Sequence, residues 1–475
     1  MSKMRKTKIV CTIGPACSSE EVLTQMCLAG MNVARLNFSH GTHEQHKENI
    51  DTIKRVREKL NLPIAILLDT KGPEYRIRTF EEGKVDLETG DKFRFYGGEE
   101  RIGSKEGVSV SYPTLAKELE VGDRILVDNG LLVFSVDGFE GDDVLTTVEF
   151  GGTISNRKSM SFPGKVLNQV YLSEQDKADI KFGIEQGIDF IACSFVSRKQ
   201  DLIDVRDFVR ENNGQGIELI AKIENRHGVD NIDEICEACS GIMVARGDLG
   251  VEIPFEELPK IQKMLISKCS LLGKRVITAT EMLESMTHSP RPTRAETSDV
   301  ANAVYDGTSA IMLSGETAAG DYPVLAVEAM SRIAEHTEEN IDYAKQFRDR
   351  EFKINNIIDA ISHATCGMAI DIEASAIAVC SISGKTARMV SRFRPPVDIL
   401  GMCCDESTMR KLALSWGVQP AMCEQLESTE VLFYTAKNKS KQVFDLKKGD
   451  RIVITGGIAG QSGNTNLIKV ETINN

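Results

Sequence analysis

Eight short apolar segments, each followed by a stretch with the spacing of an amphipathic helix, constrain the fold of this 475-residue chain more than any other feature. Apolar, β-branched runs of this length are typical of strands that are buried on both faces. The segments are KIVCTI (8–13), NVARLNF (32–38), IAILLDT (64–70), FIACSF (190–195), ELIAKIEN (218–225), GIMVARGD (241–248), RVITATE (275–281) and SAIMLSGE (309–316). Eight βα units predict a parallel sheet, either closed into a (β/α)8 barrel or open and doubly wound.

The positions of the polar residues favour the closed barrel. Each segment carries a polar residue at or near its C-terminal end: Thr12, Asn37, Asp69, Ser194, Glu224, Asp248, Thr280 and Glu316. A single residue of this kind is equally well explained as the cap of the following helix. Eight together, several of them beside a Lys or Arg, indicate an active-site rim, which barrels of this type build at that end of their strands.

Two further regions differ from the βα series. Residues 71–164 alternate with period two and have many glycine turns, which predicts a small β-barrel inserted as a lid over the rim. Residues 341–475 return to α/β alternation and predict a separate C-terminal domain, with strands at AIAVCSISG, DILGMCC, DRIVITGG and NLIKVETI. The barrel domain is then expected from 1–70 and 165–340.

Composition excludes several classes of protein. The net charge of -13 disfavours nucleic acid as a partner. The sequence contains no signal-like apolar region and no apolar stretch of membrane-spanning length, which predicts a cytoplasmic protein without a membrane partner. Twelve scattered cysteines are typical of reduced thiols. Cys236 and Cys239 have zinc-like spacing but no matching second pair, so we favour a packing role.

One strand-like segment carries the densest charge. Lys222 and Glu224 lie two residues apart and therefore share a strand face. Asp248 ends the next segment, and two carboxylates on neighbouring strands suit Mg²⁺, which takes few protein ligands. The alternative is an ion pair between Lys222 and Glu224 without catalytic meaning.

Two other segments add ligands for cations and anions. Arg35, Asn37 and Ser39 share a face of the second segment. The third continues into DTKGPEYR, whose polar residues are Asp69, Thr70, Glu74 and Arg76. The guanidinium fork of arginine binds two phosphate oxygens at once. Clustered cations, metal-binding carboxylates and backbone donors are what phosphoryl transfer requires, although no Walker motif is present.

Eight motifs in order closely resemble the pyruvate kinase family: TKIVCTIGPA, MNVARLNFSHG, LLDTKGPE, AKIEN, IMVARGDLG, ATEMLESM, PRPTRAE and IMLSGETA. The resemblance covers essentially the whole chain. It implies transfer of a phosphoryl group between phosphoenolpyruvate and ADP, with Mg²⁺ or Mn²⁺ and K⁺ as cofactors, and a homotetramer. Other enolate-handling barrels and a catalytically silent homologue are the competing functions. The former would share the metal carboxylates but would not need the ADP-facing arginines and the lid, and the latter would be expected to lose Lys222 or a metal carboxylate.

The resemblance also implies a role for each matching residue. The catalytic residues would be Lys222, Thr280 and Arg35. Phosphoenolpyruvate would bind to Arg35, Lys222, Asp248 and Thr280, and its carboxylate to the backbone of Ala245, Arg246 and Gly247. The nucleotide would bind to Asn37, His40, Arg76 and Lys158. Glu224 and Asp248 would hold the divalent metal, and K⁺ would bind to Asn37, Ser39, Asp69 and Thr70.

Three further features bear on this assignment. The segment NRKSMSFPG departs from the family's usual KKGVNLPG around Lys158, and Glu281 replaces a usual glutamine. Glu74 occupies a position where family members with glutamate use K⁺. A turn in CSISGKTAR offers a phosphate-binding site for a sugar-phosphate or nucleotide effector at Ser381, Ser383, Gly384, Lys385 and Thr386, which GGIAGQSGNTN would close over. An ordinary helix cap and flexible loop is the alternative.

Overall fold

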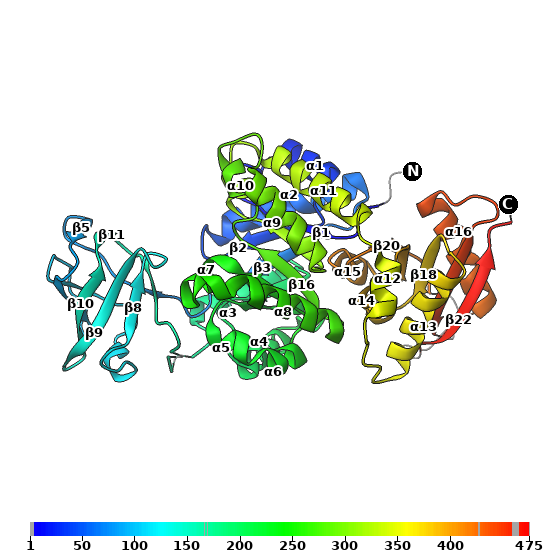
Figure 1. Ribbon diagram of the computed structural model, residues 1–475. Helices are drawn as coiled ribbons and strands as arrows, with labels where there is room; N and C mark the ends of the chain where they lie inside the picture. Colours follow the sequence, from blue (N-terminus) through cyan, green and yellow to red (C-terminus); the bar gives the residue numbers. More distant parts are fainter. Residues whose placement is uncertain (1–3, 166, 169, 426–427, 458–464, 475) are drawn as a thin grey trace.

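A computed structural model of the chain describes residues 4–165, 167–168, 170–425, 428–457 and 465–474. It contains three regions: a lid of β-strands, a central barrel and a C-terminal domain at the opposite side from the lid (Figure 1). No helix in these ranges is long and apolar enough to cross a membrane.

The eight predicted strands form a closed parallel barrel, which excludes the open sheet. Neighbouring strands around the barrel follow the order β1-β17-β16-β15-β14-β13-β3-β2. Their bounds are β1 Lys8–Thr12, β2 Val33–Asn37, β3 Ala65–Asp69, β13 Phe190–Cys193, β14 Glu218–Ile223, β15 Gly241–Ala245, β16 Arg275–Ala279 and β17 Ala310–Leu313. Because all eight strands are parallel, their carboxyl ends meet at one rim.

Helices cover the outside of the barrel, and local caps fix where several of them begin. Ser19, Thr42 and Ser173 each accept a backbone N–H in the first turn of α1, α2 and α3, as expected for N-caps. The helices are α1 Glu20–Ala29, α2 His43–Leu60, α3 Glu174–Glu185, α4 Lys199–Glu211, α5 Arg226–Asp230, α6 Ile232–Ala238, α7 Arg246–Glu252, α8 Leu258–Leu272, α9 Arg294–Tyr305, α10 Gly315–Ala318 and α11 Pro323–Glu339. One apolar core lies between these helices and the strands.

The lid is an all-β unit with its own core of phenylalanines, Phe93, Phe95 and Phe134. Seven of its strands form a sheet in the order β4-β12-β8-β9-β10-β6-β7, and β11 pairs with β5. An isolated bridge between Ile77 and Val110 links the two edges of the larger sheet into a barrel-like shape. The strands are β4 Tyr75–Arg76, β5 Lys84–Leu87, β6 Lys92–Tyr96, β7 Gly107–Ser109, β8 Arg124–Val127, β9 Leu132–Glu140, β10 Asp143–Phe150, β11 Gly152–Ser155 and β12 Ser159–Ser161.

The C-terminal domain contains a five-stranded sheet in the order β20-β19-β18-β21-β22. Its elements are α12 Tyr343–Asp349, α13 Ile357–Asp371, β18 Ala376–Cys380, α14 Lys385–Arg392, β19 Asp398–Cys403, α15 Glu406–Leu412, β20 Val418–Met422, α16 Thr429–Phe444, β21 Arg451–Gly457 and β22 Thr465–Thr472. The sequence did not predict β20, because Pro420 interrupts it. A proline is tolerated there because β20 is an edge strand.

Candidate active site

The carboxyl rim of the barrel brings together a buried network around Lys222, from β14. The Lys222 ammonium lies 3.0 Å from Asp69 Oδ1 and 3.0 Å from Glu224 Oε1. It also donates to Ser194 Oγ at 2.8 Å, and the same hydroxyl donates to the Thr70 carbonyl. Four polar groups from β3, β14 and the end of β13 are thereby fixed against one another.

Arg35 extends this network to β2 and β1. Its Nε atom donates to Asp69 Oδ2 at 2.6 Å, and an NH group donates to Thr12 Oγ1 at 2.8 Å. Asp69 therefore receives a cation on each oxygen, Arg35 on one and Lys222 on the other. All three charged side chains are almost completely buried, so each position is set by the fold before a substrate arrives.

Burial and charge act in opposite directions on these groups. Burial raises the pKa of Asp69, but Arg35 and Lys222 outweigh it and leave that pKa below its ordinary value. Burial lowers the pKa of Lys222, but Asp69 and Glu224 raise it above its ordinary value. Burial also raises the pKa of Glu224 to about 7, with Asp248 adding to the effect. The rim therefore holds Lys222 as a cation at neutral pH.

The residues predicted to receive the substrate carboxylate lie at the start of α7. The Gly247 N–H donates to Thr280 Oγ1 at 2.7 Å, which joins the ends of β15 and β16. The guanidinium of Arg246 is buried; it pairs with Asp299 and donates to the carbonyls of Ala279 and Thr280 at the end of β16. Because its guanidinium is engaged in this way, Arg246 has its backbone left for the predicted binding of the substrate carboxylate.

Thr280 has an unusual backbone. Its φ is 69°, and that of Glu281 is 53°, so two successive residues with side chains adopt the left-handed conformation. For a β-branched threonine this is a rare and strained state. The strain is maintained by the hydrogen bonds of Arg246 to both carbonyls, and it holds the Thr280 hydroxyl beside Gly247.

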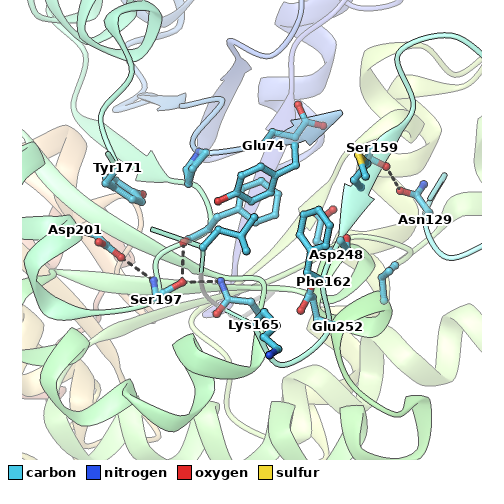
Figure 2. Close-up of a pocket in the computed structure, with 18 of the residues that line it drawn as sticks. Glu74, Asn129, Ser159, Phe162, Lys165, Tyr171, Ser197, Asp201, Asp248 and Glu252 are labelled. Carbon is cyan, nitrogen blue, oxygen red and sulfur yellow. Dashed lines mark hydrogen bonds between the residues drawn. The ribbon is translucent and has the colours of Figure 1, made fainter. Parts of the chain in front are cut away.

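A cavity of about 110 Å³ separates the lid from the rim (Figure 2). Asp248 and Glu252 from α7 lie on one side, and Glu74, Ser159 and Phe162 come from the lid and its connections. Glu252, which the sequence analysis did not select, interacts with Ser161 and the Phe162 backbone. Charged side chains from both domains line the cavity: the carboxylates of Glu74, Asp201, Asp248 and Glu252, and the cations Lys165 and Arg198.

Arg76 and Lys158, the lid cations predicted to bind the nucleotide, lie close to each other but apart from the rim. Ile77 N donates to the Lys158 carbonyl, and Arg76 is the strand partner of Ser159. Arg76 pairs with Glu74 at 2.5 Å and Lys158 pairs with Asp128 at 3.0 Å. Neither cation has a bond to the barrel rim among the described residues.

The predicted K⁺ ligands are neighbours at the ends of β2 and β3. Asn37 and Asp69 are strand partners, and Ser39 N donates to Asn37 Oδ1. Thr70 Oγ1 accepts the Ser194 N–H. His40 follows on an exposed turn, where its carbonyl contacts the His46 ring.

Two family models match this chain. The one described as "Pyruvate kinase, barrel domain" matches residues 4–327, and the one described as "Pyruvate kinase, alpha/beta domain" matches residues 359–471.

The chain belongs to the pyruvate kinase family.

Individual relatives agree over almost the whole length. Pyruvate kinase of Clostridium acetobutylicum is 45% identical over 99% of this chain and 100% of its own. Pyruvate kinase of Geobacillus stearothermophilus is 48% identical over 99% of this chain and 80% of its own. A crystal structure of a pyruvate kinase from Cryptosporidium parvum has a TM-score of 0.94 and 38% identity, and covers 98% of this chain and 96% of that one. The chain is therefore an enzyme, a phosphotransferase, with the fold of the pyruvate kinases.

Ser194 was noted in the sequence only as a polar strand end, yet it is central to the site of this pyruvate kinase family member. It bonds to Lys222, to Asp69 and to Thr70. Glu316, noted in the same way, is instead structural, because its carboxylate accepts the backbone N–H groups of Leu283 and Ser314. Position at a strand end predicts that a residue lies at the rim but does not separate these two roles.

The remaining predicted sites lie outside the barrel rim. Gly384 has a φ of 71° and precedes α14, whose first turn includes Lys385 and Thr386. Ser381 and Ser383 lie in the same turn, while most of GGIAGQSGNTN lies outside the described residues. Cys236 packs against Cys269, with their sulfurs 3.7 Å apart. The described residues contain no group of three or more His, Cys, Asp or Glu side chains suited to a metal.

Proposed function

We propose that this chain transfers the phosphoryl group of phosphoenolpyruvate to ADP, giving pyruvate and ATP, and that Lys222 is the central catalytic cation. The observation that carries this assignment is the buried position of Lys222 between Asp69 and Glu224 at the carboxyl rim. An ammonium fixed there neutralises charge on a transferring phosphoryl group without reorganising during the reaction.

The groups around Lys222 have distinct roles in this proposal. Arg35, held by Asp69 and Thr12, directs a fixed cation at the phosphate. The backbone of Ala245, Arg246 and Gly247 receives the substrate carboxylate at the start of α7. Thr280 holds a hydroxyl beside this backbone and takes part in delivering a proton to the enolate carbon through water.

The donor sets fit the metals that the family implies. Glu224 directly follows β14, and Asp248 lies in α7, which follows the adjacent strand β15. The two supply carboxylates, which suits Mg²⁺ or Mn²⁺. A divalent metal bound there supplies charge neutralisation for phosphoenolpyruvate. Asn37, Ser39, Asp69 and Thr70 supply hard oxygen ligands at two paired strand ends, which suits K⁺.

The nucleotide is proposed to bind between the rim and the lid. Asn37 and His40 belong to the barrel side, whereas Arg76 and Lys158 belong to the lid. Closure of the lid over the cavity would add the two lid cations to the ADP phosphates and exclude water. The ion pairs of Arg76 with Glu74 and of Lys158 with Asp128 would then exchange for phosphate.

A coupled assay tests the reaction. Pyruvate formation from phosphoenolpyruvate is followed with and without ADP, in Mg²⁺ and K⁺. We expect pyruvate only when ADP is present, with ATP formed in equal amount. Pyruvate formed without ADP would indicate a different phosphoenolpyruvate-consuming reaction and contradict the proposal.

Regulation and assembly are proposed from the C-terminal domain and the family. Ser381, Ser383, Gly384, Lys385 and Thr386 offer hydroxyls, backbone N–H groups and a cation to a phosphate-bearing effector, a sugar phosphate or a nucleotide. A homotetramer and a cytoplasmic location are proposed with them. Lys385→Ala should abolish any shift that such effectors cause in the phosphoenolpyruvate saturation curve, and analytical ultracentrifugation measures the assembly. Effectors that leave the wild-type curve unmoved would remove this site.

A further inference from the structure

A second charged cavity lies at the opposite end of the barrel, where the amino ends of the strands meet the C-terminal domain. Its volume is about 20 Å³. Arg275 begins β16 on the barrel side, and α14 and the segment after it form the other side. The cavity is lined by Ser270, Gly273, Lys274, Arg275, Ser309, Arg388, Ser391, Arg392, Arg394, Ser415 and Trp416. Four guanidinium groups and four serines therefore surround one small space.

Two of these arginines share one carboxylate. Arg275 pairs with Glu218 Oε2, and Arg388 lies 3.2 Å from Glu218 Oε1. Arg275 also donates to Ser415 Oγ and to the Lys411 carbonyl of the C-terminal domain. Its side chain is almost completely buried, so this contact fixes the barrel against the C-terminal domain.

The other two arginines are less well neutralised. Arg392 pairs with Asp359 at 3.0 Å, and both side chains are about 95% buried. Arg394 forms no ion pair with any described residue; it donates to the Gly307 carbonyl and to Ser309 Oγ and lies 4.6 Å from the Trp416 ring. Four guanidinium groups thus face two carboxylates, which leaves two guanidinium charges without a paired carboxylate. Lys274 at the same cavity donates to the Cys239 carbonyl and adds a further cation.

Several guanidinium N–H groups at this cavity have no acceptor. The buried Nε atoms of Arg388, Arg392 and Arg394, and NH1 of Arg394, have no hydrogen-bond partner among the described residues. A buried donor without a partner costs free energy, and the cost is larger for a charged group. Burial lowers the pKa of Arg394 to about 9, which reflects the same cost.

We propose that this cavity is a binding site for a phosphate group, separate from the catalytic rim and from the turn at Ser381–Thr386. Guanidinium forks bind two oxygens of a phosphate at once, and the serine hydroxyls add neutral donors. A phosphate dianion would balance the two unpaired charges and accept the four unpartnered N–H groups. A carboxylate has fewer oxygens and one negative charge.

The size of the cavity restricts the ligand. Its volume of about 20 Å³ is little more than one water molecule needs, so a sugar or a base does not fit, and a phosphate fits only if the arginine side chains move apart. The ligand is therefore inorganic phosphate, or a phosphate monoester whose phosphate enters between the arginines while its organic part stays outside.

The site also connects the two ends of the barrel. Glu218 begins β14, the strand that carries Lys222, and Arg275 begins β16, the strand that ends beside Thr280. A phosphate bound at Arg388 and Arg394 would consolidate the contact between the C-terminal domain and the feet of these two strands.

Calorimetric titration of the full-length protein tests the proposal. Inorganic phosphate and glycerol phosphate are titrated separately at pH 8, with potassium chloride holding the ionic strength constant. The variants are Arg388→Gln and Arg394→Lys, which change two of the arginines that line the cavity. Lys385→Ala reports on the turn before α14. Arg348→Gln is the matched control, because Arg348 is an exposed arginine of the same domain that pairs with Asp371.

We expect Arg348→Gln to bind phosphate as wild type does, and both cavity variants to bind it about tenfold more weakly, since a hydrogen bond between charged groups has this magnitude. Lys385→Ala should keep the binding that the cavity variants lose, and any loss in Lys385→Ala belongs to the turn at Ser381–Thr386. Circular dichroism checks that each variant is folded. Arg388→Gln keeps the ion pair of Arg275 with Glu218, so it still tests the site if Arg394→Lys does not fold. If the cavity variants also bind glycerol phosphate more weakly, the site accepts phosphate monoesters. If only their binding of inorganic phosphate is weakened, the site is specific for the free ion. Equal affinity in Arg388→Gln and Arg348→Gln, or no binding to wild type at millimolar phosphate, would overturn the proposal, whatever the catalytic assay shows.

Discussion

The two ends of the barrel bury arginine and lysine side chains in different ways. At the carboxyl rim, Lys222 and Arg35 pair with Asp69 and Glu224, so each cation has a carboxylate partner, and Asp248 adds a further carboxylate nearby. At the amino end, four arginines face only Glu218 and Asp359. The same strands, β14 and β16, contribute to both ends.

The difference indicates what each end is built to do. A balanced network keeps Lys222 charged and fixed at neutral pH, and its charge is used only when a phosphoryl group enters. An unbalanced cluster carries a standing electrostatic cost, which a bound anion relieves. Substitutions that remove one cation from each end should therefore affect different measurements.

Lys222→Met should have the largest effect. Removing the cation at the rim should lower kcat by about 10²- to 10³-fold, with a much smaller change in KM, because the charge acts mainly in the transition state. Steady-state kinetics at saturating Mg²⁺, K⁺ and ADP measure both constants.

Lys177→Met is the matched control, since Lys177 is a partly exposed lysine on α3 that pairs with Glu174. It should leave both constants unchanged. A Lys222→Met enzyme with wild-type kcat and a raised KM would remove Lys222 from the chemical step.

Arg275→Met makes the equivalent change at the amino end and should lower stability rather than turnover. It leaves Glu218 with Arg388 alone, so we expect a loss of about 2 kcal/mol in stability, less than for a fully broken buried pair. The midpoint of urea unfolding should fall, while kcat of the folded enzyme stays within about twofold of wild type. Arg348→Met, on the exposed surface, should change neither. A large fall in kcat with an unchanged midpoint would contradict the contrast between the two ends.

The sequence predicted the rim far better than the amino-end cavity. Glu224 and Asp248 could be found because strand order brings the ends of parallel strands to one rim, whichever helices lie between them. Arg388 and Arg394 could not be found in this way, because they lie on α14 and after it, and their distance from Arg275 depends on how the C-terminal domain docks. The missed β20 has the same origin, since its pairing with β19 outweighs the local signal of Pro420.

Glu74→Lys should change the response to K⁺. Glu74 is largely buried and pairs with Arg76, so another carboxylate lies at a mouth that must accept the charges of phosphoenolpyruvate and ADP. We expect the wild type to lose about tenfold or more of its activity without K⁺, and the variant to lose little, because the new ammonium supplies the charge.

Activity is measured in tetramethylammonium buffer with Mg²⁺, adding potassium chloride at constant ionic strength. Glu100→Lys, an exposed lid carboxylate paired with Arg78, is the control and should keep the wild-type requirement. Full wild-type activity without K⁺ would refute the assignment of Asn37, Ser39, Asp69 and Thr70.

The last prediction concerns Glu252, a buried acidic residue without a cationic partner, whereas the arginine cavity holds buried cations without an anionic partner. Glu252 is the last residue of α7, contacts Ser161 and the Phe162 backbone of the lid, and forms no ion pair in the described part of the chain. Burial raises its pKa from the ordinary value of 4.5 to about 7, and Asp248 adds to the shift. Folding therefore favours the protonated carboxyl, whereas the unfolded chain favours the carboxylate above pH 4.5.

The sign of the pH dependence follows directly. Between pH 4.5 and about 7 the folded protein binds more protons at Glu252 than the unfolded chain does, so this residue makes stability fall as the pH rises, with no further change above pH 7. The glutamine of Glu252→Gln cannot ionise, so the free energy of unfolding of wild type should fall by about 1–2 kcal/mol relative to that of the variant between pH 5 and pH 8. This figure is smaller than the whole pKa shift would give, because Glu252 is partly exposed to solvent. Urea midpoints of both proteins at each pH give this difference and cancel the other titrating groups; Glu256→Gln, an exposed carboxylate nearby, should follow wild type. If the stability of wild type instead rises relative to that of Glu252→Gln as the pH increases, the lid contact stabilises the ionised carboxylate, which would contradict the prediction.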